Sequence, residues 1–472
     1  MYTNQFSNYL KKKKKTIKKL VEKLGESFEY VSCLGTDVRS TRIMVDKNVT
    51  NIAPSSITES GFVVRVKGAE TYFEYSINEI TEKNLDEIVE KIKEEAKKTH
   101  AATPVKAALL DDEPLTKDFI RKDNGRLYTE DEIISILKEK VKANVGGEVV
   151  NIRTAIECSE YNKMFISKNK TLTQYYTWTN GQAYTTTRRE DKFQSGYSGN
   201  GYPTLEDAIN GIDKCINYSK EVGIMLLDAE TPVPGVYDII TDPSITGLIA
   251  HEAFGHGVEM DMYVKDRAKS KEYINKEVAS ALVNMHDGAK ATHSSASYFF
   301  DDDGVLAQDT KIIEDGILRR GISDALSAAE LGTKPTGNGR RESYKRKSYT
   351  RMTNTFFEAG TSTLDEMIKS IKYGYMIFDT DNGMEDPKSW GIQCTAAYGK
   401  EIKNGEFTGK IIAPVVMSGY VIDLLKSITA VSNGFRVIGS GSCGKGYKEW
   451  VRVSDGGACL KARVKIGWLS NL

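Results

Sequence analysis

A short segment near the middle of the chain carries two histidines and a carboxylate. Residues 251–256 read HEAFGH. Imidazole nitrogens are common zinc ligands, and a carboxylate beside a zinc site can deprotonate the attacking water and later pass the proton to a leaving amine. These residue types therefore predict a hydrolytic zinc site in which His251 and His256 hold the metal and Glu252 is the base.

The spacing of the two histidines constrains the backbone. Around a regular α-helix, histidines four residues apart are separated by about 40°, whereas the five-residue spacing of His251 and His256 gives about 140°. A straight helix would direct the two rings away from each other. Two local structures remedy this: one wide turn within the helix, or a helix that ends before His256. Gly255 and Gly257 permit either structure, because glycine has no Cβ to restrict the backbone.

A third ligand must come from elsewhere in the chain. Cys443 lies in residues 439–446, GSGSCGKG, where small residues allow close approach to an ion and sharp bending around it. A thiolate is a strong zinc ligand, and Lys445 is expected to lower the pKa of this thiol. Two histidines and one cysteine leave the fourth position of a zinc ion open, which is typical of a catalytic site.

Each of these features also has a plainer interpretation. Two histidines with this spacing can occur by chance, and a cysteine between glycines is often a buried thiol in a turn. His286 and His293 are rival ligands, although they lie in a polar stretch without helical periodicity. His100 is expected to be a surface residue.

The segment with the histidines is expected on a helix that begins at Pro243. Asp242 is a favourable N-cap, and a proline in the first helical position loses no hydrogen bond. A strand over residues 236–240 precedes this helix. Beyond residue 300 short strands and glycine-rich turns dominate, with one helix near 364–373. The pattern predicts a strand-rich C-terminal domain that carries the metal-site helix.

The N-terminal half alternates between helical and strand patterns. Thr129 and Glu132 form a capping-box pair at the start of one predicted helix. Residues 100–125 are polar and are expected to form a long connection. Strands are predicted at 62–68, at 71–76 and, as an antiparallel set with short polar turns, over 148–190; helices are predicted at 85–92, from 130 onward, and at 205–221.

The chain length predicts two domains. One compact core seldom exceeds roughly 250–300 residues, and this chain has 472. The irregular segment ETPVPG at 230–235 favours a boundary within residues 222–234. We therefore expect an N-terminal α/β domain over residues 1–221 and a C-terminal domain over residues 222–472.

The overall charge and the apolar content exclude several classes of protein. Lysine plus arginine and aspartate plus glutamate each number 65, so no basic face for a nucleic-acid partner is indicated. The Lys11–Lys15 run is expected to be the solvated end of a helix. No secretory signal is recognised, and no run approaches the roughly 20 apolar residues of a membrane span. The 6 cysteines include no C-x-x-C pair, which favours reduced thiols in a cytoplasmic protein.

Several longer motifs carry a family resemblance. Residues 251–259 read HEAFGHGVE, and further motifs follow in order at 335–344, 351–355, 442–445 and 453–457. Together they resemble the TldD/PmbA metalloproteases, and within that family the metal-bearing, TldD-like branch with its H-E-x-x-x-H signature. The N-terminal half is similar to the family only in general pattern.

The resemblance implies a function and a set of site residues. The family's metal ligands fall on His251, His256 and Cys443, and its catalytic glutamate falls on Glu252. The implied protein is a zinc-dependent peptidase with an α+β fold of mixed and antiparallel sheets in two domains. It acts on peptides or unfolded segments and forms a homodimer, or a heterodimer with a related subunit that lacks the metal. The continuation after Lys445, which includes Tyr447 and Trp450, departs from the family, so substrate preference is not carried over.

The motif at 335–344 adds candidate substrate-binding residues. Arginine can bind a peptide carboxylate and asparagine can donate to an oxyanion, so Asn338, Arg340 and Arg341 are candidates. The alternative is a structural turn in which the arginines pair with acids such as Asp301–Asp303.

Two other functions stay open beside the peptidase. The chain can be a catalytically silent, peptide-binding partner subunit, although that would require a broken ligand set. It can also catalyse metal-assisted hydrolysis of an amide that is not a peptide.

Overall fold

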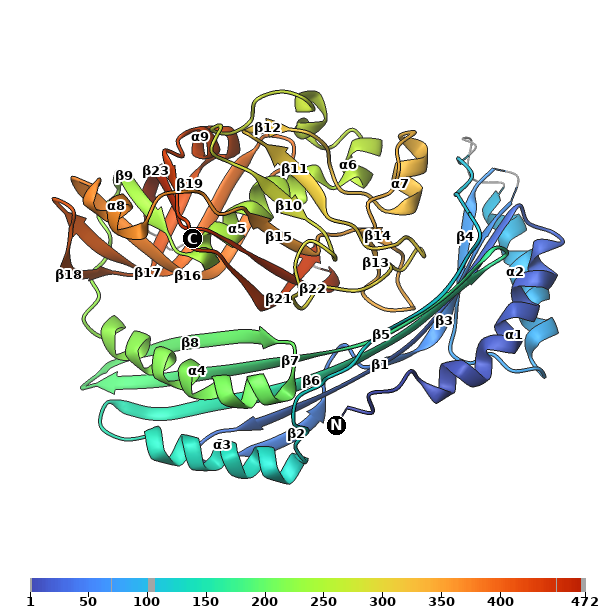
Figure 1. The fold of residues 1–472 in the computed structure, drawn as a ribbon, viewed down its shortest axis with the longest axis horizontal. Coiled ribbons are helices and arrows are strands. Elements are labelled where there is room, and N and C mark those ends of the chain that lie inside the picture. The colour runs from blue at the N-terminus through green and yellow to red at the C-terminus, as the bar shows by residue number, and fades with distance from the viewer. Residues whose placement is uncertain (1, 69, 101–106, 447, 468–472) are drawn as a thin grey trace.

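The computed structural model describes residues 2–68, 70–100, 107–446 and 448–467. Its N-terminal half is built on one long, curved sheet of eight strands (Figure 1). The strand order is β4-β3-β1-β6-β7-β5, with β2 beside β1 and β8 beside β7. The strands are β1 (Tyr30–Val45), β2 (Thr50–Pro54), β3 (Glu59–Lys67), β4 (Tyr72–Ile77), β5 (Leu115–Arg121), β6 (Val149–Ser167), β7 (Lys170–Arg189) and β8 (Lys192–Tyr202).

Four helices cover one face of this sheet, and the C-terminal half lies against the other. Val31 and Cys33 of β1 pack beneath the first two helices, whereas Leu34, on the opposite face, packs against Phe300 of the C-terminal half. Successive side chains of a strand point to opposite faces, so β1 contributes to both cores. The helices are α1 (Asn8–Gly25), α2 (Leu85–His100), α3 (Glu130–Asn144) and α4 (Leu205–Leu226).

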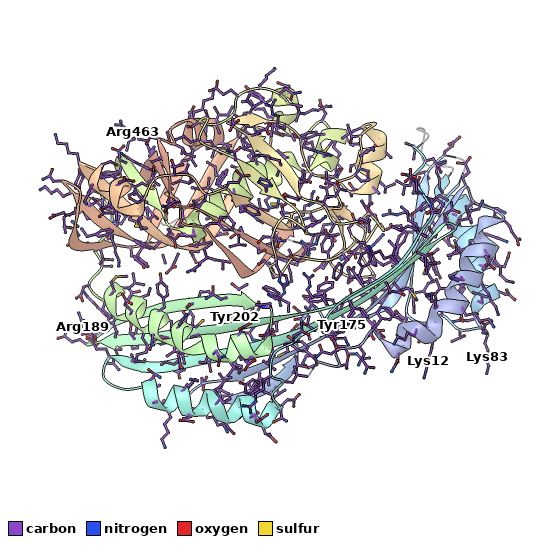
Figure 2. The ribbon with its side chains drawn as sticks, in the orientation of Figure 1. Lys12, Lys83, Tyr175, Arg189, Tyr202 and Arg463 are labelled. Carbon is purple, nitrogen blue, oxygen red and sulfur yellow. The ribbon has the colours of Figure 1, made fainter. Side chains whose placement is uncertain are left out.

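Several predictions for these helices are confirmed. Thr129 and Glu132 form the capping box of α3. Lys12, in the lysine run of α1, projects into solvent (Figure 2). Among the described residues no helix is long and apolar enough to cross a membrane.

One prediction for this half is wrong, and another is confirmed only in part. Part of the expected connection at 100–125 is β5, which pairs in parallel with β7; its side chains are mostly exposed, so its polar sequence carries no strand signal. The strands expected over 148–190 are antiparallel, as predicted, but they are two long strands, β6 and β7, rather than several joined by short polar turns. Polar residues that resembled turns, such as Ser159 and Glu160, are buried in mid-strand and hydrogen-bonded.

The C-terminal half contains two larger sheets. Six strands pair in the order β12-β11-β10-β15-β22-β21, in which β21 is an edge. In the second sheet β16 pairs with both β9 and β17, so β16, β9, β23, β19 and β17 close into a ring. The strands are β9 (Gly235–Thr241), β10 (Met285–Asp287), β11 (Thr310–Glu314), β12 (Ile317–Leu318), β15 (Asn354–Phe357), β16 (Tyr373–Glu385), β17 (Gly391–Lys403), β18 (Glu406–Ile412), β19 (Val415–Tyr420), β20 (Ala430–Val431), β21 (Arg436–Lys445), β22 (Lys448–Gly457) and β23 (Leu460–Gly467), with the pair β13 (Gly339–Arg340) and β14 (Tyr349–Thr350).

Helix α5 (Pro243–Phe254) packs against both of these sheets. Every residue from Ser244 to Phe254 is buried, and the helix contacts β15 and β22 of one sheet and β16 of the other. A helix that is apolar on nearly all sides belongs in the middle of a core. Its start is as predicted, since the side chain of Asp242 accepts from the N–H of Ile245. The shorter helices are η1 (His256–Val258), α6 (Met260–Val264), η2 (Lys269–Tyr273), α7 (Ala325–Glu330), α8 (Leu364–Lys369) and α9 (Val421–Lys426); α8 is the helix predicted at 364–373, ending earlier.

Buried ion pairs join the two halves. Arg65 of β3 lies 2.9 Å from the carboxylate of Asp303, which belongs to the C-terminal half. The same guanidinium lies 2.8 Å from the carboxylate of Glu74 on the neighbouring strand β4. Since α4 continues to Leu226, we propose that the domain boundary lies in residues 227–234, which join α4 to β9. The α+β fold with two domains is as predicted.

A second contact between the halves predicts a pH-dependent stability. Tyr218 of α4 donates to the carboxylate of Asp379 on β16. Burial, together with the nearby Asp242, raises the pKa of Asp379 to about 7. Between pH 4 and 7 the carboxyl group of Asp379 therefore takes up a proton when the chain folds. The folded state is most stable with Asp379 protonated at low pH, and this stability is lost as the pH rises from about 4 through 7.

Asp379→Asn should therefore raise the free energy of unfolding by on the order of 2 kcal/mol at pH 8, and by much less at pH 4. Urea unfolding midpoints measured across this range test it. Asp381→Asn, an exposed neighbour on the same strand, is the control. If Asp379→Asn raised the free energy of unfolding by the same amount at every pH, the raised pKa of Asp379 would be contradicted.

Candidate metal centre

Three side chains from distant parts of the chain meet at the end of α5. They are His251 on α5, His256 on η1 and Cys443 on β21. One ligand atom from each lies within 4.8 Å of the other two. The Cys443 Sγ and His256 Nε2 atoms are 3.2 Å apart, and the two imidazole rings are 5.1 Å apart and perpendicular, at 89°. Among the described residues this is the one group of three such side chains close enough to share an ion.

The backbone resolves the five-residue spacing by the second predicted route. Helix α5 ends at Phe254, and Gly255 caps it through a hydrogen bond to the carbonyl oxygen of His251. His256 then begins a separate 3₁₀ turn, which brings its ring back toward His251. The capping position requires glycine, because a Cβ on Gly255 would lie 2.2 Å from the His251 carbonyl and 2.1 Å from the sulfur of Met352.

The cysteine is in the charge state that binds metals, whereas the two histidines are protonated in the absence of a cation. Burial alone would raise the pKa of the Cys443 thiol, but the imidazoles of His251 and His256 outweigh it and lower that pKa to about 4. Conversely, burial alone would lower the pKa of His251. The nearby Cys443 sulfur outweighs burial and raises the pKa of His251 to about 9. The sulfur is thus a thiolate, which is the ligand form of cysteine, and a cation beside it would release the imidazole protons.

Each histidine also has a carboxylate behind it. His256 Nδ1 lies 3.4 Å from a carboxylate oxygen of Glu259, and His251 Nδ1 lies 3.9 Å from that of Asp455. His251 Nδ1 is buried and has no hydrogen-bond partner among the described residues. Metal-ligating histidines commonly direct their second nitrogen to a carboxylate, which fixes the ring and increases its basicity. The donor set, its thiolate and these carboxylates fit a zinc ion.

Two cations, one fully buried and one partly buried, complete the surroundings of the cluster. Arg351, fully buried, donates to the Cys443 sulfur at 3.1 Å and to its carbonyl oxygen at 3.0 Å, and lies 3.5 Å from Glu259. Lys445 binds Glu259 at 2.9 Å and Asp261 at 2.8 Å. The expectation that Lys445 lowers the thiol pKa is therefore wrong: its ammonium is bound to two carboxylates, and the imidazoles have that effect.

Glu252 follows His251 on α5 and is buried next to β16. Gly383 of β16 leaves space for it, since a Cβ there would lie 2.8 Å from Glu252 Cγ. Glu385, two residues farther along β16, is a second carboxyl group beside the cluster. Both of its oxygens are buried without a partner among the described residues, and burial with the nearby Glu252 raises its pKa to about 9, so it is neutral.

The loop at 337–341 has a largely internal role in this structure. The Asn338 amide is fully buried and donates to Asp287 and to the carbonyl of Arg351. The Arg341 guanidinium binds Glu74, and its backbone N–H donates to Asp302. Arg340 donates to the carbonyl of Met352 and also lines a small cavity. This arrangement resembles the structural turn of the alternative interpretation more than an exposed substrate clamp.

The rival histidines lie elsewhere. His286 is held between Asp309 and Glu358, and His293 lies against the ring of Trp178. The side chain of His100 and residue Tyr447 lie outside the described residues, while Trp450 is 52% exposed.

Most of the residues that support the ligands were not predicted from the sequence. Arg351, Asp455 and Lys445 lie inside motifs that were recognised, but nothing in the motif letters indicates which side chain faces the cluster. Glu259 is the one supporting residue whose place the sequence indicates. It follows His256 by three residues, which is the spacing of neighbours on one side of a helical turn. Glu385 carries no local signal, because it is one acid among several in the stretch DNGMED.

Comparison with known proteins agrees with this geometry. Residues 234–455 match the profile of the PmbA/TldA metallopeptidase C-terminal domain. A metalloprotease of Methanocaldococcus jannaschii is 32% identical over 243 residues, which are 52% of this chain and 53% of that protein. A protein of Saccharolobus solfataricus named zinc metalloprotease TldD homolog is 33% identical over 253 residues, 53% of this chain and 56% of that one. The sequence matches thus span about half the length of these relatives.

The fold extends the likeness to the whole chain. The crystal structure of TldE from Thermococcus kodakarensis superposes with a TM-score of 0.77, covering 96% of this chain and 100% of that one, at 17% identity. Its low identity supports the fold alone, whereas the profile match and the relatives support the family. Residues 234–455 therefore match a domain of the TldD/PmbA family, and the whole chain has the fold of TldE.

Proposed function

We propose that this protein is a zinc-dependent peptidase that hydrolyses peptides or unfolded polypeptide segments. The observation that carries the proposal is the meeting of His251, His256 and Cys443 beside Glu252, in a chain whose relatives are named metalloproteases. Two histidines and a cysteine are a zinc-type donor set that leaves a coordination position free. All of these residues are present, which argues against a catalytically silent partner subunit.

The proposed chemistry assigns each residue one task. Zinc in this donor set supplies a Lewis acid, which lowers the pKa of water and polarises an amide carbonyl. His251, His256 and Cys443 would hold it. The Glu252 carboxylate, next in sequence to His251, would accept the proton of the attacking water and deliver it to the amine that leaves. Glu259 and Asp455 would orient the two imidazoles from behind.

The proposed assembly is a dimer, with an identical chain or with a related subunit. It is supported by the likeness to TldE, a related protein with the same fold.

Loss of any one ligand should remove the metal. We expect purified wild-type protein to contain about one zinc per chain, and His251→Ala, His256→Ala and Cys443→Ala each to contain far less, because two remaining donors bind zinc weakly. Elemental analysis of dialysed protein measures this. The matched control is Cys459→Ala, which removes another buried thiol of the same domain. Full zinc content in Cys443→Ala would show that the sulfur is no ligand.

Loss of the base should abolish turnover but retain the metal. Glu252→Gln keeps the shape of the side chain and removes its basicity, so kcat should fall by about 10²–10⁴ while zinc content is unchanged. Cleavage of a fluorogenic peptide library measures the rate. Glu272→Gln, an exposed glutamate on η2, should behave as wild type. Wild-type turnover in Glu252→Gln would exclude this residue as the base.

The carboxylate behind His251 should tune the affinity for the metal. Asp455→Asn preserves size but removes the charge that faces His251 Nδ1, so the zinc dissociation constant should rise about 10–100-fold. Competition with a chromophoric chelator measures the constant. An unchanged affinity would mean that Asp455 does not support the ligand.

A further inference from the structure

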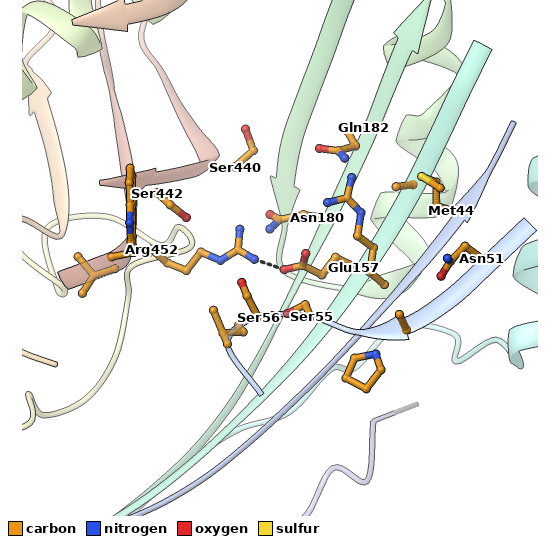
Figure 3. A pocket seen from close by; sticks show the side chains of 17 residues that line it. Met44, Asn51, Ser55, Ser56, Glu157, Asn180, Gln182, Ser440, Ser442 and Arg452 are labelled. Carbon is orange, nitrogen blue, oxygen red and sulfur yellow. Dashed lines mark hydrogen bonds and ion pairs between the residues drawn. The ribbon is translucent and has the colours of Figure 1, made fainter. Parts of the chain in front are cut away.

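A cavity separate from the metal cluster lies between the two halves of the molecule. It has a volume of about 680 Å³, which is in the range of ligand sites. Strands β1, β2, β6 and β7 form one wall, and the β21–β22 hairpin forms the other (Figure 3). We refer to this space as the hairpin cleft. Besides the residues discussed below, it is lined by Asn51, Ala53, Pro54, Ser55, Ser56, Ile57 and Val451.

The strand register gives the sheet wall a defined set of polar groups. Arg42 on β1 pairs with Glu157 on β6, which pairs with Asn180 on β7. In the adjacent row Met44 and Gln182 flank Ala155. Residues that pair across strands lie on the same face. A guanidinium, a carboxylate and two amides thus face the cleft side by side.

The cleft has one positive charge in excess. Its charged residues are Arg42, Arg452 and Glu157. Arg452 of the hairpin is ion-paired with Glu157, as the dashed line in Figure 3 marks. The Arg42 guanidinium has neither a hydrogen bond nor an ion pair to any described residue. A cavity wall that holds an unpaired guanidinium next to a neutralised pair is suited to a single anionic group.

The hairpin wall places the cleft directly behind the metal site. Ser440 and Ser442 face the cleft, whereas Cys443, the next residue of β21, belongs to the cluster on the opposite side. Trp450 also lines the cleft, and its ring packs on Gly444, since a Cβ there would lie 3.2 Å from three of its atoms. The half-exposed indole offers an apolar surface beside the hydroxyls and amides.

We propose that the hairpin cleft is a second peptide-binding site, which holds a carboxylate-bearing segment through Arg42. The identity of the ligand rests on the proposed peptidase function. A planar carboxylate matches the two-pronged donor geometry of a guanidinium. Asn180, Gln182 and the serine hydroxyls provide partners for backbone amides, and Trp450 receives an apolar side chain. A peptide segment offers all three kinds of group, and its carboxylate can be a C-terminus or an acidic side chain.

The test uses the full chain carrying Glu252→Gln, so that bound peptides are not cleaved. Three fluorescein-labelled hexapeptides of otherwise equal sequence are compared by anisotropy: one with a free C-terminus, one amidated, and one amidated with an internal glutamate. We expect at least one acid-bearing peptide to bind about ten-fold or more tightly than the uncharged peptide. Which of the two does so distinguishes a terminal from a side-chain carboxylate.

Arg42→Ala should abolish that preference, and Arg42→Lys should restore part of it, because lysine keeps the charge without the planar fork. Arg39→Ala is the matched control, an exposed arginine on the opposite face of the same strand. Trp450→Ala should weaken all three peptides without removing the preference. Equal binding of charged and uncharged peptides, or a preference that survives Arg42→Ala, would overturn the proposal.

One more binding measurement distinguishes binding in the hairpin cleft from binding at the metal centre. The preference should persist in the double variant Glu252→Gln, His251→Ala, because the cleft lies on the other side of the hairpin. Its loss there would also overturn the proposal. Failure of the peptidase function is seen independently, as an absence of peptide cleavage by the zinc-loaded wild-type protein.

Discussion

Helix α5 is buried on every side, and the packing of the C-terminal domain follows from this. The helix has no face toward solvent, so its polar side chains must find partners within the protein. At its start Asp242 caps the helix and Thr246 donates to the carbonyl of Ala458. At its end His251 lies beside the sulfur of Cys443 and 3.9 Å from the carboxylate of Asp455, both from the sheet that packs on it. The packing that stabilises the domain is therefore the packing that assembles the candidate metal site.

Buried charges of both signs hold this arrangement together. The thiolate of Cys443 lies among two imidazoles and the guanidinium of Arg351, and Glu259 lies between Arg351, Lys445 and His256. Each charge has an opposite neighbour, and removing one leaves another buried and unpaired, which typically costs about 3–5 kcal/mol. The set acts as a unit. The acids and cations around the ligands thus serve both the fold and the basicity of the donors.

The sequence predicted the residues that meet but not the way in which they are supported. The pair His251 and His256 was recognisable from residue type, and the odd spacing already required irregular backbone, which Gly255 supplies. Arg351 and Glu385 were not predictable as neighbours of the cluster, because strand pairing and helix packing between distant segments decide which side chains face it. In the N-terminal half, the length of β6 was not predictable, because polar residues such as Glu160 interrupt its apolar pattern. Their burial is possible only because hydrogen-bond partners come from other strands.

In the proposed metal centre one sulfur and two imidazole nitrogens surround a single cation. X-ray absorption spectroscopy of the zinc-loaded protein tests it most directly. We expect one sulfur neighbour at about 2.3 Å from the zinc and two imidazole nitrogens at about 2.0–2.1 Å. A first shell of nitrogen and oxygen alone, with no sulfur scattering, would contradict it.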